Sequence, residues 1–188
     1  MDRVCVYCGS SAGNSKVYAD AARDLAEVLV RSGIGLVYGG SSRGIMGMLA
    51  DAVLAGGGRV EGVIPKSLIE KEIAHESLTE MHVVDSMHAR KSLMAVLSDG
   101  FVAMPGGFGT LEEIVEILTW AQLQFHDKPC GLYNVTGYFN HLLSFLDHAE
   151  AEGFLRPAHR AMLHVSKRPA DLIRRFECYV PPTAVKWR

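Results

Sequence analysis

The sequence predicts an α/β fold, a doubly wound parallel sheet flanked by helices, in a single domain spanning residues 1–188. Short apolar runs alternate with longer stretches of helical periodicity, which is the pattern of βαβ units. The chain has 188 residues, a length that suits one domain with a sizeable core. No internal repeat, low-complexity tract or linker divides it.

Strands are expected where short apolar runs occur, because strands of a parallel sheet are buried on both faces. These runs are 3–8, 35–38, 60–64, 82–84, 101–104, 131–133 and 162–165. Helices are expected between them, at 15–31, 45–55, 87–97, 111–124, 138–152 and 169–177. Glycines at 33 and 56–58 end two of these helices. The more polar segment 66–79 is expected to pass over the strand ends, and Pro181 and Pro182 begin a surface tail.

Composition excludes several classes of function. Hydrophobic residues make up 48% of the chain and the net charge is −2, as in an ordinary soluble protein. No long like-charge run occurs, so a nucleic-acid partner is not indicated. No apolar stretch reaches membrane-spanning length, and the first residues lack the apolar core of a signal peptide. We therefore expect a cytoplasmic protein with no membrane association.

The cysteines and histidines do not indicate a metal site. Cys5 and Cys8 form a C-x-x-C, a spacing that occurs in redox and zinc sites. The pair lies inside the first expected strand and no second C-x-x-C accompanies it, which favours buried, reduced thiols. The eight histidines form no ligand pattern. We expect neither a metal nor a cofactor.

The most informative feature is the glycine-rich segment 105–110, which joins an expected strand to an expected helix. Pro105 ends the strand, and the glycines that follow let backbone N–H groups approach a ligand. Thr110 can cap the following helix. Free N–H groups and the positive end of a helix dipole together form an anion site. The loop therefore predicts phosphate binding.

Three further polar or glycine-rich loops, 9–13, 39–44 and 85–91, follow expected strands. Because ligands bind beyond the carboxyl ends of parallel strands, we expect all four loops at one functional edge of the sheet. The common nucleotide fingerprints are absent, since neither G-x-G-x-x-G nor G-x-x-x-x-G-K-[ST] occurs. The spacing of the glycines therefore argues against a dinucleotide dehydrogenase or a P-loop enzyme. It remains compatible with binding of a mononucleotide.

The charged residues beside the loop have two interpretations each. Thr110 and Glu113 have the spacing of a capping box, and Glu112 and Glu116 can complement the helix dipole from solvent-facing positions. Alternatively, a carboxylate next to a phosphate loop takes part in chemistry. Arg90 and Lys91 fall early in an expected helix, where cations oppose the dipole. They are either a solvated pair or the partners of an anion.

The helix expected at 111–124 is apolar on nearly all sides. Such a helix is buried, either in the core of the domain or in a subunit interface.

These motifs resemble a known family. The run from Pro105 to Glu113 matches the P-G-G-x-G-T-x-x-E signature of the "Lonely Guy" cytokinin riboside 5′-monophosphate phosphoribohydrolases, whose members were often labelled lysine decarboxylases. The resemblance covers nearly the whole chain and includes C-V-Y-C-G-S-S at 5–11, V-Y-G-G at 37–40, G-I-M-G at 44–47, V-I-P at 63–65 and M-H-A-R-K at 87–91. The decarboxylase label would require a pyridoxal phosphate lysine, which no feature of the sequence supports.

The resemblance implies a Rossmann-like fold, a homodimer, and hydrolysis of the N-glycosidic bond of a nucleoside 5′-monophosphate. By position it implies Arg90 and Glu113 as the catalytic pair. It implies substrate contacts at Glu72, Arg90, Lys91, Gly107, Phe108, Gly109, Thr110, Leu111, Glu112, Glu113 and Thr119. The residues agree with this chemistry, because a carboxylate stabilises the positive charge that develops on the ribose.

Two alternatives stay open from the sequence. One is the same reaction on a broader range of nucleotides, such as AMP. The other is a nucleotide- or cofactor-binding protein without catalysis; molybdenum-cofactor carriers resemble this fold. The presence of both Arg90 and Glu113 favours an enzyme.

Overall fold

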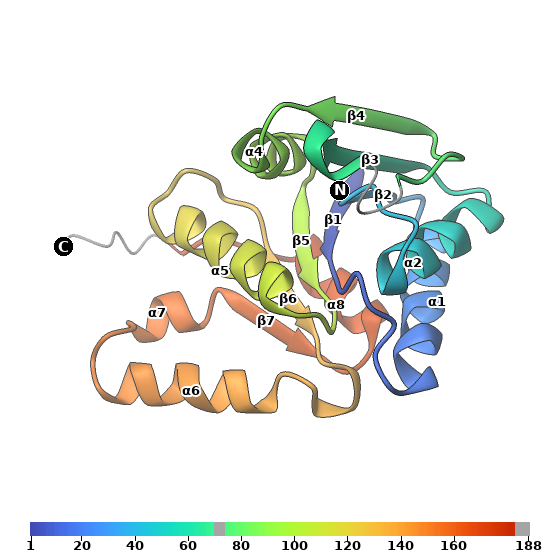
Figure 1. Cartoon of the computed structure of the whole chain (residues 1–188). Coiled ribbons are helices and arrows are strands. Elements are labelled where there is room, and N and C mark those ends of the chain that lie inside the picture. Colours follow the sequence, from blue (N-terminus) through green and yellow to red (C-terminus); the bar gives the residue numbers. More distant parts are fainter. Residues whose placement is uncertain (70–73, 183–188) are drawn as a thin grey trace.

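The computed structural model describes residues 1–69 and 74–182, and a seven-stranded sheet forms its centre (Figure 1). The strand order is β4-β3-β2-β1-β5-β6-β7, and every neighbouring pair is parallel. The strands are β1 (Arg3–Tyr7), β2 (Gly35–Tyr38), β3 (Val60–Pro65), β4 (Glu80–Val84), β5 (Gly100–Ala103), β6 (Cys130–Tyr133) and β7 (Leu163–Ser166). The predicted α/β class, with a Rossmann-like parallel sheet, is confirmed.

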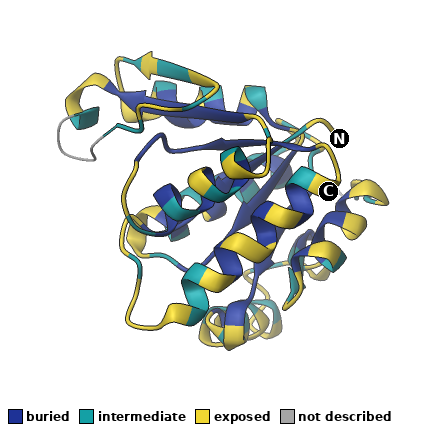
Figure 2. Cartoon of the chain, turned by 90° about the vertical axis from the view of Figure 1, so that its right-hand side faces the viewer, coloured by how far each residue is buried: buried dark blue, intermediate teal, exposed yellow. Residues whose placement is uncertain are grey.

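Helices cover both faces of this sheet. One face packs against α1 (Lys16–Arg31), α2 (Gly44–Ala55) and α8 (Pro169–Glu177). The other packs against α4 (Met87–Leu97), α5 (Phe108–Gln122) and α6 (Asn140–Ala151). Two 3₁₀ turns, η1 (Lys66–Leu68) and η2 (Val135–Gly137), and the short α7 (Pro157–Arg160) complete the described elements. Figure 2 shows buried strands between helices whose outer faces are exposed.

Side chains of each central strand alternate between the two layers. On β1, Val4 and Val6 belong to the core beneath α1 and α2, whereas Cys5 and Tyr7 belong to the core beneath α4 and α5. All four are at least 97% buried. A strand covered on both faces has no polar side, which is why the apolar runs of the sequence locate the strands.

The structure moves two helix boundaries from their predicted positions. Helix α5 begins at Phe108, three residues before the expected start at 111, because Gly107 is its N-cap and the loop ends earlier. The helix predicted over 138–152 is α6, which begins two residues later, at Asn140. The turn η2 precedes it, and Thr136 within that turn has a positive φ of 49°. Helix α7 was not predicted; proline at its first position suits a short helix.

The order of the strands reverses between β1 and β5, so the loops that follow these two strands lead to opposite faces of the sheet. In open α/β sheets this switch point is where ligands bind. Two backbone hydrogen bonds join the loops here, from Met104 N–H to Tyr7 O at 2.9 Å and from Gly9 N–H to Pro105 O at 3.1 Å. The described part of segment 66–79 returns beside the end of β2, where His75 N–H bonds Gly40 O at 2.9 Å.

Candidate functional site

A cleft of about 260 Å³ opens at the switch point, at the carboxyl edge of the sheet. The end of β1 and the loops that follow β1, β2 and β5 line it, together with α2, α4 and α5. Its lining combines glycines and a few polar groups with apolar side chains: Val6, Tyr7, Cys8, Gly9, Ser10, Gly39, Met46, Met87, Arg90, Met94, Gly107, Phe108, Gly109, Thr110 and Glu113. The cleft therefore unites the predicted phosphate loop with both predicted catalytic residues.

Helix α5 points an uncapped N-terminus at this cleft. Its N-cap is Gly107, which has no side chain, and its first backbone bond runs from Leu111 N–H to Gly107 O at 3.2 Å. The amides of Phe108, Gly109 and Thr110 precede that bond and have no carbonyl of their own helix to pair with. The capping box predicted for Thr110 and Glu113 is wrong, because both residues lie inside the helix.

Each of the other two helices that wall the cleft has an amide of its first turn occupied. Ile45 N–H, at the start of α2, bonds Gly9 O at 3.1 Å. Ser86 caps α4 by accepting from Ala89 N–H at 3.1 Å. Within the described ranges, α5 is the one of these three helices whose first turn shows no such capping bond, and its N–H donors and dipole favour an anion.

Glycine at position 106 is required by packing. A Cβ there would lie 2.1 Å from Thr110 Oγ1 and 2.8 Å from Gly9 N. Thr110, which is 3% exposed, fills the space beneath the loop instead of capping the helix. The glycine of the signature therefore lets the loop fold against β1 and the first turn of α5.

Arg90 is buried in the wall of the cleft, with 4% of its surface exposed. Its Nη2 donates to Gly39 O, the carbonyl after β2, at 2.9 Å. A Cβ on residue 39 would lie 2.1 Å from the same Nη2, so glycine at 39 makes room for the guanidinium. The solvated-pair interpretation of Arg90 is wrong. Its guanidinium instead places a buried cation in the wall of the cleft.

Glu113 lines the cleft from α5, and its charge acts on the end of β1. Burial raises the pKa of both Cys5 and Cys8, and the carboxylate of Glu113 raises them further. The charge of Arg90 acts on the pKa of Cys5 in the opposite direction without reversing the increase, so this one buried thiol is subject to both charges. The walls of the cleft thus combine the buried cation of Arg90 with the partly buried carboxylate of Glu113.

Lys91 lies beside the cleft lining and is held by α5. Its Nζ contacts Glu112 Oε1 at 2.5 Å and Glu116 Oε2 at 2.9 Å. Burial favours the neutral amine, but the hydrogen bonds that Lys91 donates to Glu112 and Glu116 outweigh it and raise the pKa of Lys91. The prediction that Glu112 and Glu116 only face solvent is wrong, since together they tie α4 to α5.

The remaining predicted contacts lie away from the cleft lining or outside the described residues. Leu111 packs against the core on the α5 side of the sheet. Thr119 Oγ1 donates to Val115 O at 2.8 Å, and the residue borders a separate apolar cavity of about 210 Å³ between α5 and α6. Glu72 falls in 70–73, outside the described ranges. The structure thus gathers part of the predicted site within one chain.

Sequence reasoning missed the apolar wall of the cleft. Met46, Met87 and Met94 line it from α2 and α4. Methionine side chains are polarisable and adapt to flat or irregular apolar groups. Their clustering depends on the packing of two helices that are distant in sequence, although Met46 and Met87 stand inside motifs that the sequence singled out.

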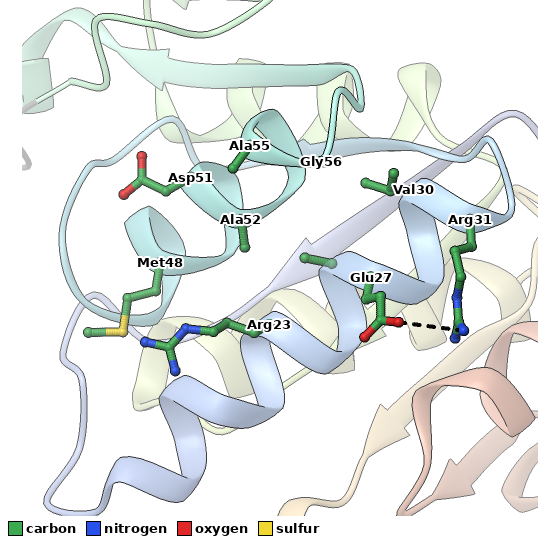
Figure 3. A pocket seen from close by; sticks show the side chains of 10 residues that line it. Arg23, Glu27, Val30, Arg31, Met48, Asp51, Ala52, Ala55 and Gly56 are labelled. Carbon is green, nitrogen blue, oxygen red and sulfur yellow. Dashed lines mark ion pairs between the residues drawn. The ribbon is translucent and has the colours of Figure 1, made fainter.

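A second hollow, of about 630 Å³, lies between α1 and α2 (Figure 3). Arg23, Glu27 and Arg31 line it from α1, opposite Met48 and Asp51 of α2. The Glu27–Arg31 ion pair at 3.5 Å has both side chains 66% exposed, which is typical of a solvated surface. Acidic and basic side chains alternate along this hollow and do not point toward a common centre. The cleft at the switch point is therefore the better candidate site.

One group of metal-ligating side chains occurs within the described ranges. Glu61, Glu80 and His82 place ligand atoms within 4.8 Å of one another at the start of β3 and β4. Glu61 already accepts from Arg59 at 3.0 Å and from Arg3 at 3.3 Å. These two guanidinium groups neutralise the carboxylate that a cation would need.

Comparison with known proteins agrees with the motifs. A family model described as "Possible lysine decarboxylase" matches residues 46–176. The chain is 53% identical to a probable cytokinin riboside 5′-monophosphate phosphoribohydrolase, LOGL2, of Oryza sativa subsp. japonica, over 95% of this chain and 73% of that protein. It is 52% identical to the cytokinin riboside 5′-monophosphate phosphoribohydrolase LOG1 of Arabidopsis thaliana, over 95% of this chain and 84% of that protein.

Solved structures share the fold at lower sequence identity. A molybdenum cofactor carrier protein from Chlamydomonas reinhardtii superposes with a TM-score of 0.69 at 20% identity, covering 95% of this chain and 99% of that one. The molybdenum cofactor binding protein of Rippkaea orientalis gives 0.68 at 18% identity, covering 95% and 96%. Within the described parts of the chain, no helix has the length and apolar character needed to cross a membrane.

The decarboxylase description can be compared with the lysines near the cleft. Schiff-base chemistry uses a lysine whose pKa is lowered so that the neutral amine attacks. The described lining of the cleft contains no lysine, and adjacent Lys91 has a raised pKa. The residues present do not fit a pyridoxal phosphate site.

Proposed function

This chain belongs to the LOG family of cytokinin riboside 5′-monophosphate phosphoribohydrolases, and we propose that it hydrolyses the N-glycosidic bond of such nucleotides. The products are a free adenine-type base and ribose 5-phosphate. One observation carries the proposal: Glu113, Arg90 and the uncapped start of α5 share a single cleft at the switch point. The cleft supplies an anion site, a carboxylate and a buried cation.

The 5′-phosphate binds at the start of α5. The amides of Phe108, Gly109 and Thr110 and the helix dipole attract it, and the phosphate itself does not react. Glu113 lies five residues beyond Phe108, which is about 7.5 Å along the helix axis at 1.5 Å per residue. A sugar attached to the phosphate therefore extends toward the carboxylate. Binding energy from the phosphate lowers the barrier at the sugar.

The chemical step separates the base from the ribose. The C1′–N bond breaks with its electron pair going to the base, and positive charge develops on the ribose ring. The Glu113 carboxylate stabilises this charge and orients or deprotonates the attacking water. The water oxygen bonds to C1′. The proton that the water loses is transferred to the departing base. Arg90 orients Glu113 or an anionic group of the substrate through its planar guanidinium.

The three methionines favour a substrate with an apolar group on its base. Met46, Met87 and Met94 offer adaptable apolar surface beside the catalytic pair. This supports an N6-modified adenine over AMP. The broader nucleotidase remains the second candidate, since glycines and backbone amides at the phosphate do not discriminate between bases.

Substrate comparison tests the proposal. N6-isopentenyladenosine 5′-monophosphate, AMP and N6-isopentenyladenosine are incubated with the enzyme, and free base is quantified by chromatography. We expect base release from the modified monophosphate, a lower kcat/KM for AMP, and the lowest for the riboside. Equal kcat/KM for the riboside and its monophosphate would show that the glycine loop does not bind phosphate. Absence of base release from both nucleotides would refute the enzyme.

We also propose that the protein is a homodimer. Val115 on α5 is 50% exposed and Val96 on α4 is 71% exposed, so the chain alone leaves apolar surface on the helices that wall the site. Two-fold dimers are the commonest closed assemblies. A partner would cover this surface and would bring Glu72, Lys91 and Thr119 into a shared site. Light scattering at micromolar concentration should return twice the 20.5 kDa chain mass. A fully active monomer would rule out the shared site.

A cytoplasmic location fits the cysteines. Cys5, Cys8 and Cys130 are buried free thiols, as expected where the compartment is reducing. Fractionation of cells that express the tagged protein would test this location.

A further inference from the structure

Tyr138 lies in the crossover that follows β6 and contacts the phosphate loop. Its hydroxyl donates to Gly106 O at 2.7 Å, across 32 residues of sequence. Tyr138 follows η2 and precedes α6, so the contact joins the crossover after β6 to the loop after β5. The residue does not line the cleft. Any effect on the site must therefore pass through the loop.

The tyrosine ring is held in place by its surroundings. It packs edge-on against Tyr18 of α1 at a centroid distance of 5.9 Å and against Phe139 at 5.0 Å. Phe139 is 2% exposed, and its N–H donates to Asn134 Oδ1 at 2.8 Å. Asn134 in turn donates from Nδ2 to Asn140 Oδ1 at 2.9 Å. Because these groups are anchored, the hydroxyl of Tyr138 has a defined position.

The bond fixes the orientation of the peptide that joins two adjacent glycines. Gly106 and Gly107 lack side chains, so their backbone has more accessible conformations than any other pair. Two neighbouring carbonyls of the loop are tethered: Pro105 O by Gly9 N–H at 3.1 Å and Gly106 O by Tyr138. In a planar trans peptide the N–H points opposite the C=O. Directing Gly106 O toward Tyr138 therefore directs Gly107 N–H away from it.

We propose that Tyr138 is a positioning residue for the phosphate loop: it sets the Gly106–Gly107 peptide and thereby the affinity of the α5 N-terminus for the 5′-phosphate. The inference rests on the proposed function. It gives the loop a fixed peptide at the point where two glycines are adjacent. It also makes affinity for the phosphate depend on a residue that touches neither phosphate nor sugar.

Tyr138→Phe tests this, because it keeps both ring contacts and removes only the hydroxyl. A net hydrogen bond of ordinary strength corresponds to roughly a 2- to 10-fold change in an equilibrium constant. We expect KM for N6-isopentenyladenosine 5′-monophosphate to rise by that factor while kcat stays within about twofold. Tyr179→Phe, at the end of α8, is the matched control and should leave both constants unchanged. An unchanged KM, or a fall in kcat alone, would overturn the inference.

Direct binding separates this inference from the proposed function. Calorimetric titration with ribose 5-phosphate needs no turnover, and Tyr138→Phe should weaken its binding by the same roughly 2- to 10-fold. If the wild type releases no base but binds ribose 5-phosphate more tightly than the variant, the proposed function fails and the role of Tyr138 stands. Equal affinities, or no binding to the wild type, would overturn the role of Tyr138.

Discussion

Alanine at the two adjacent glycines of the phosphate loop should lower stability at one position and leave it nearly unchanged at the other. At Gly106 an added Cβ would lie 2.1 Å from Thr110 Oγ1 and 2.8 Å from Gly9 N, whereas ordinary contact begins at 3.4 Å. Thr110 can rotate its hydroxyl away, but Gly9 N is backbone and is tied to Pro105 O. Gly106→Ala must therefore displace the loop from β1.

The size of the effect follows from the cost of overpacking. Such insertions destabilise by about 1–3 kcal/mol. For a chain of this length each kcal/mol lowers Tm by roughly 2–4 °C. At Gly107 an added Cβ meets nothing within 4 Å, and φ is −92°, which any residue adopts. Alanine is a poorer N-cap than glycine but lowers the entropy of the unfolded chain, so Gly107→Ala should stay within about 0.5 kcal/mol of wild type.

Urea unfolding and steady-state kinetics distinguish the two variants. We expect Gly106→Ala to lose both stability and affinity for the nucleotide. Gly107→Ala should keep its stability but raise KM, because its methyl group narrows the approach of the phosphate to the helix amides. The reasoning would be refuted if Gly106→Ala unfolds at the same urea concentration as wild type, or if both variants lose equal stability.

Three further substitutions probe Arg90 and Asp99. Arg90→Ala should abolish base release and lower the free energy of unfolding by about 1–3 kcal/mol, since Gly39 O loses its donor inside the protein. Arg90→Lys keeps the charge but not the planar fork, and full activity in that variant would show that charge alone suffices. Burial opposes ionisation of Asp99, but the backbone N–H groups of Arg3 and Asp2 outweigh it and hold its pKa below the usual 3.8. The stability that the Asp99 carboxylate provides is therefore present above pH 3.8. It is lost as the pH falls through the lowered pKa of the folded state. Asp99→Asn should destabilise at pH 7 and less so at pH 3; an equal deficit at both pH values, measured by urea unfolding, would contradict this.

Much of the fold follows from the sequence because the sheet is parallel and covered on both faces. Its strands are short apolar runs such as 35–38 and 101–104, and each of these two is followed by a helix of distinct periodicity. The carboxyl ends of parallel strands share one edge, so the predicted loops had to lie near one another. The location of the cleft was thus accessible from pattern alone.

The local chemistry of the site depends on contacts between distant residues and was not accessible in the same way. Thr110 has the sequence context of a cap, yet packing beneath Gly106 takes it into the helix and leaves the α5 amides open. The burial of Arg90 depends on space left by Gly39, 51 residues earlier. Tyr138 comes from another crossover and carries no motif. Such pairings arise only when the strands are brought into register.

Base release by the wild type and by Glu113→Gln tests the central claim most directly. The substitution keeps the size of the side chain and removes its charge. With N6-isopentenyladenosine 5′-monophosphate, the wild type should release base and ribose 5-phosphate in equal amounts. Glu113→Gln should be slower by roughly 10²-fold or more, with its circular dichroism spectrum unchanged. Turnover near the wild-type rate in Glu113→Gln would contradict the assignment of Glu113 as the catalytic carboxylate.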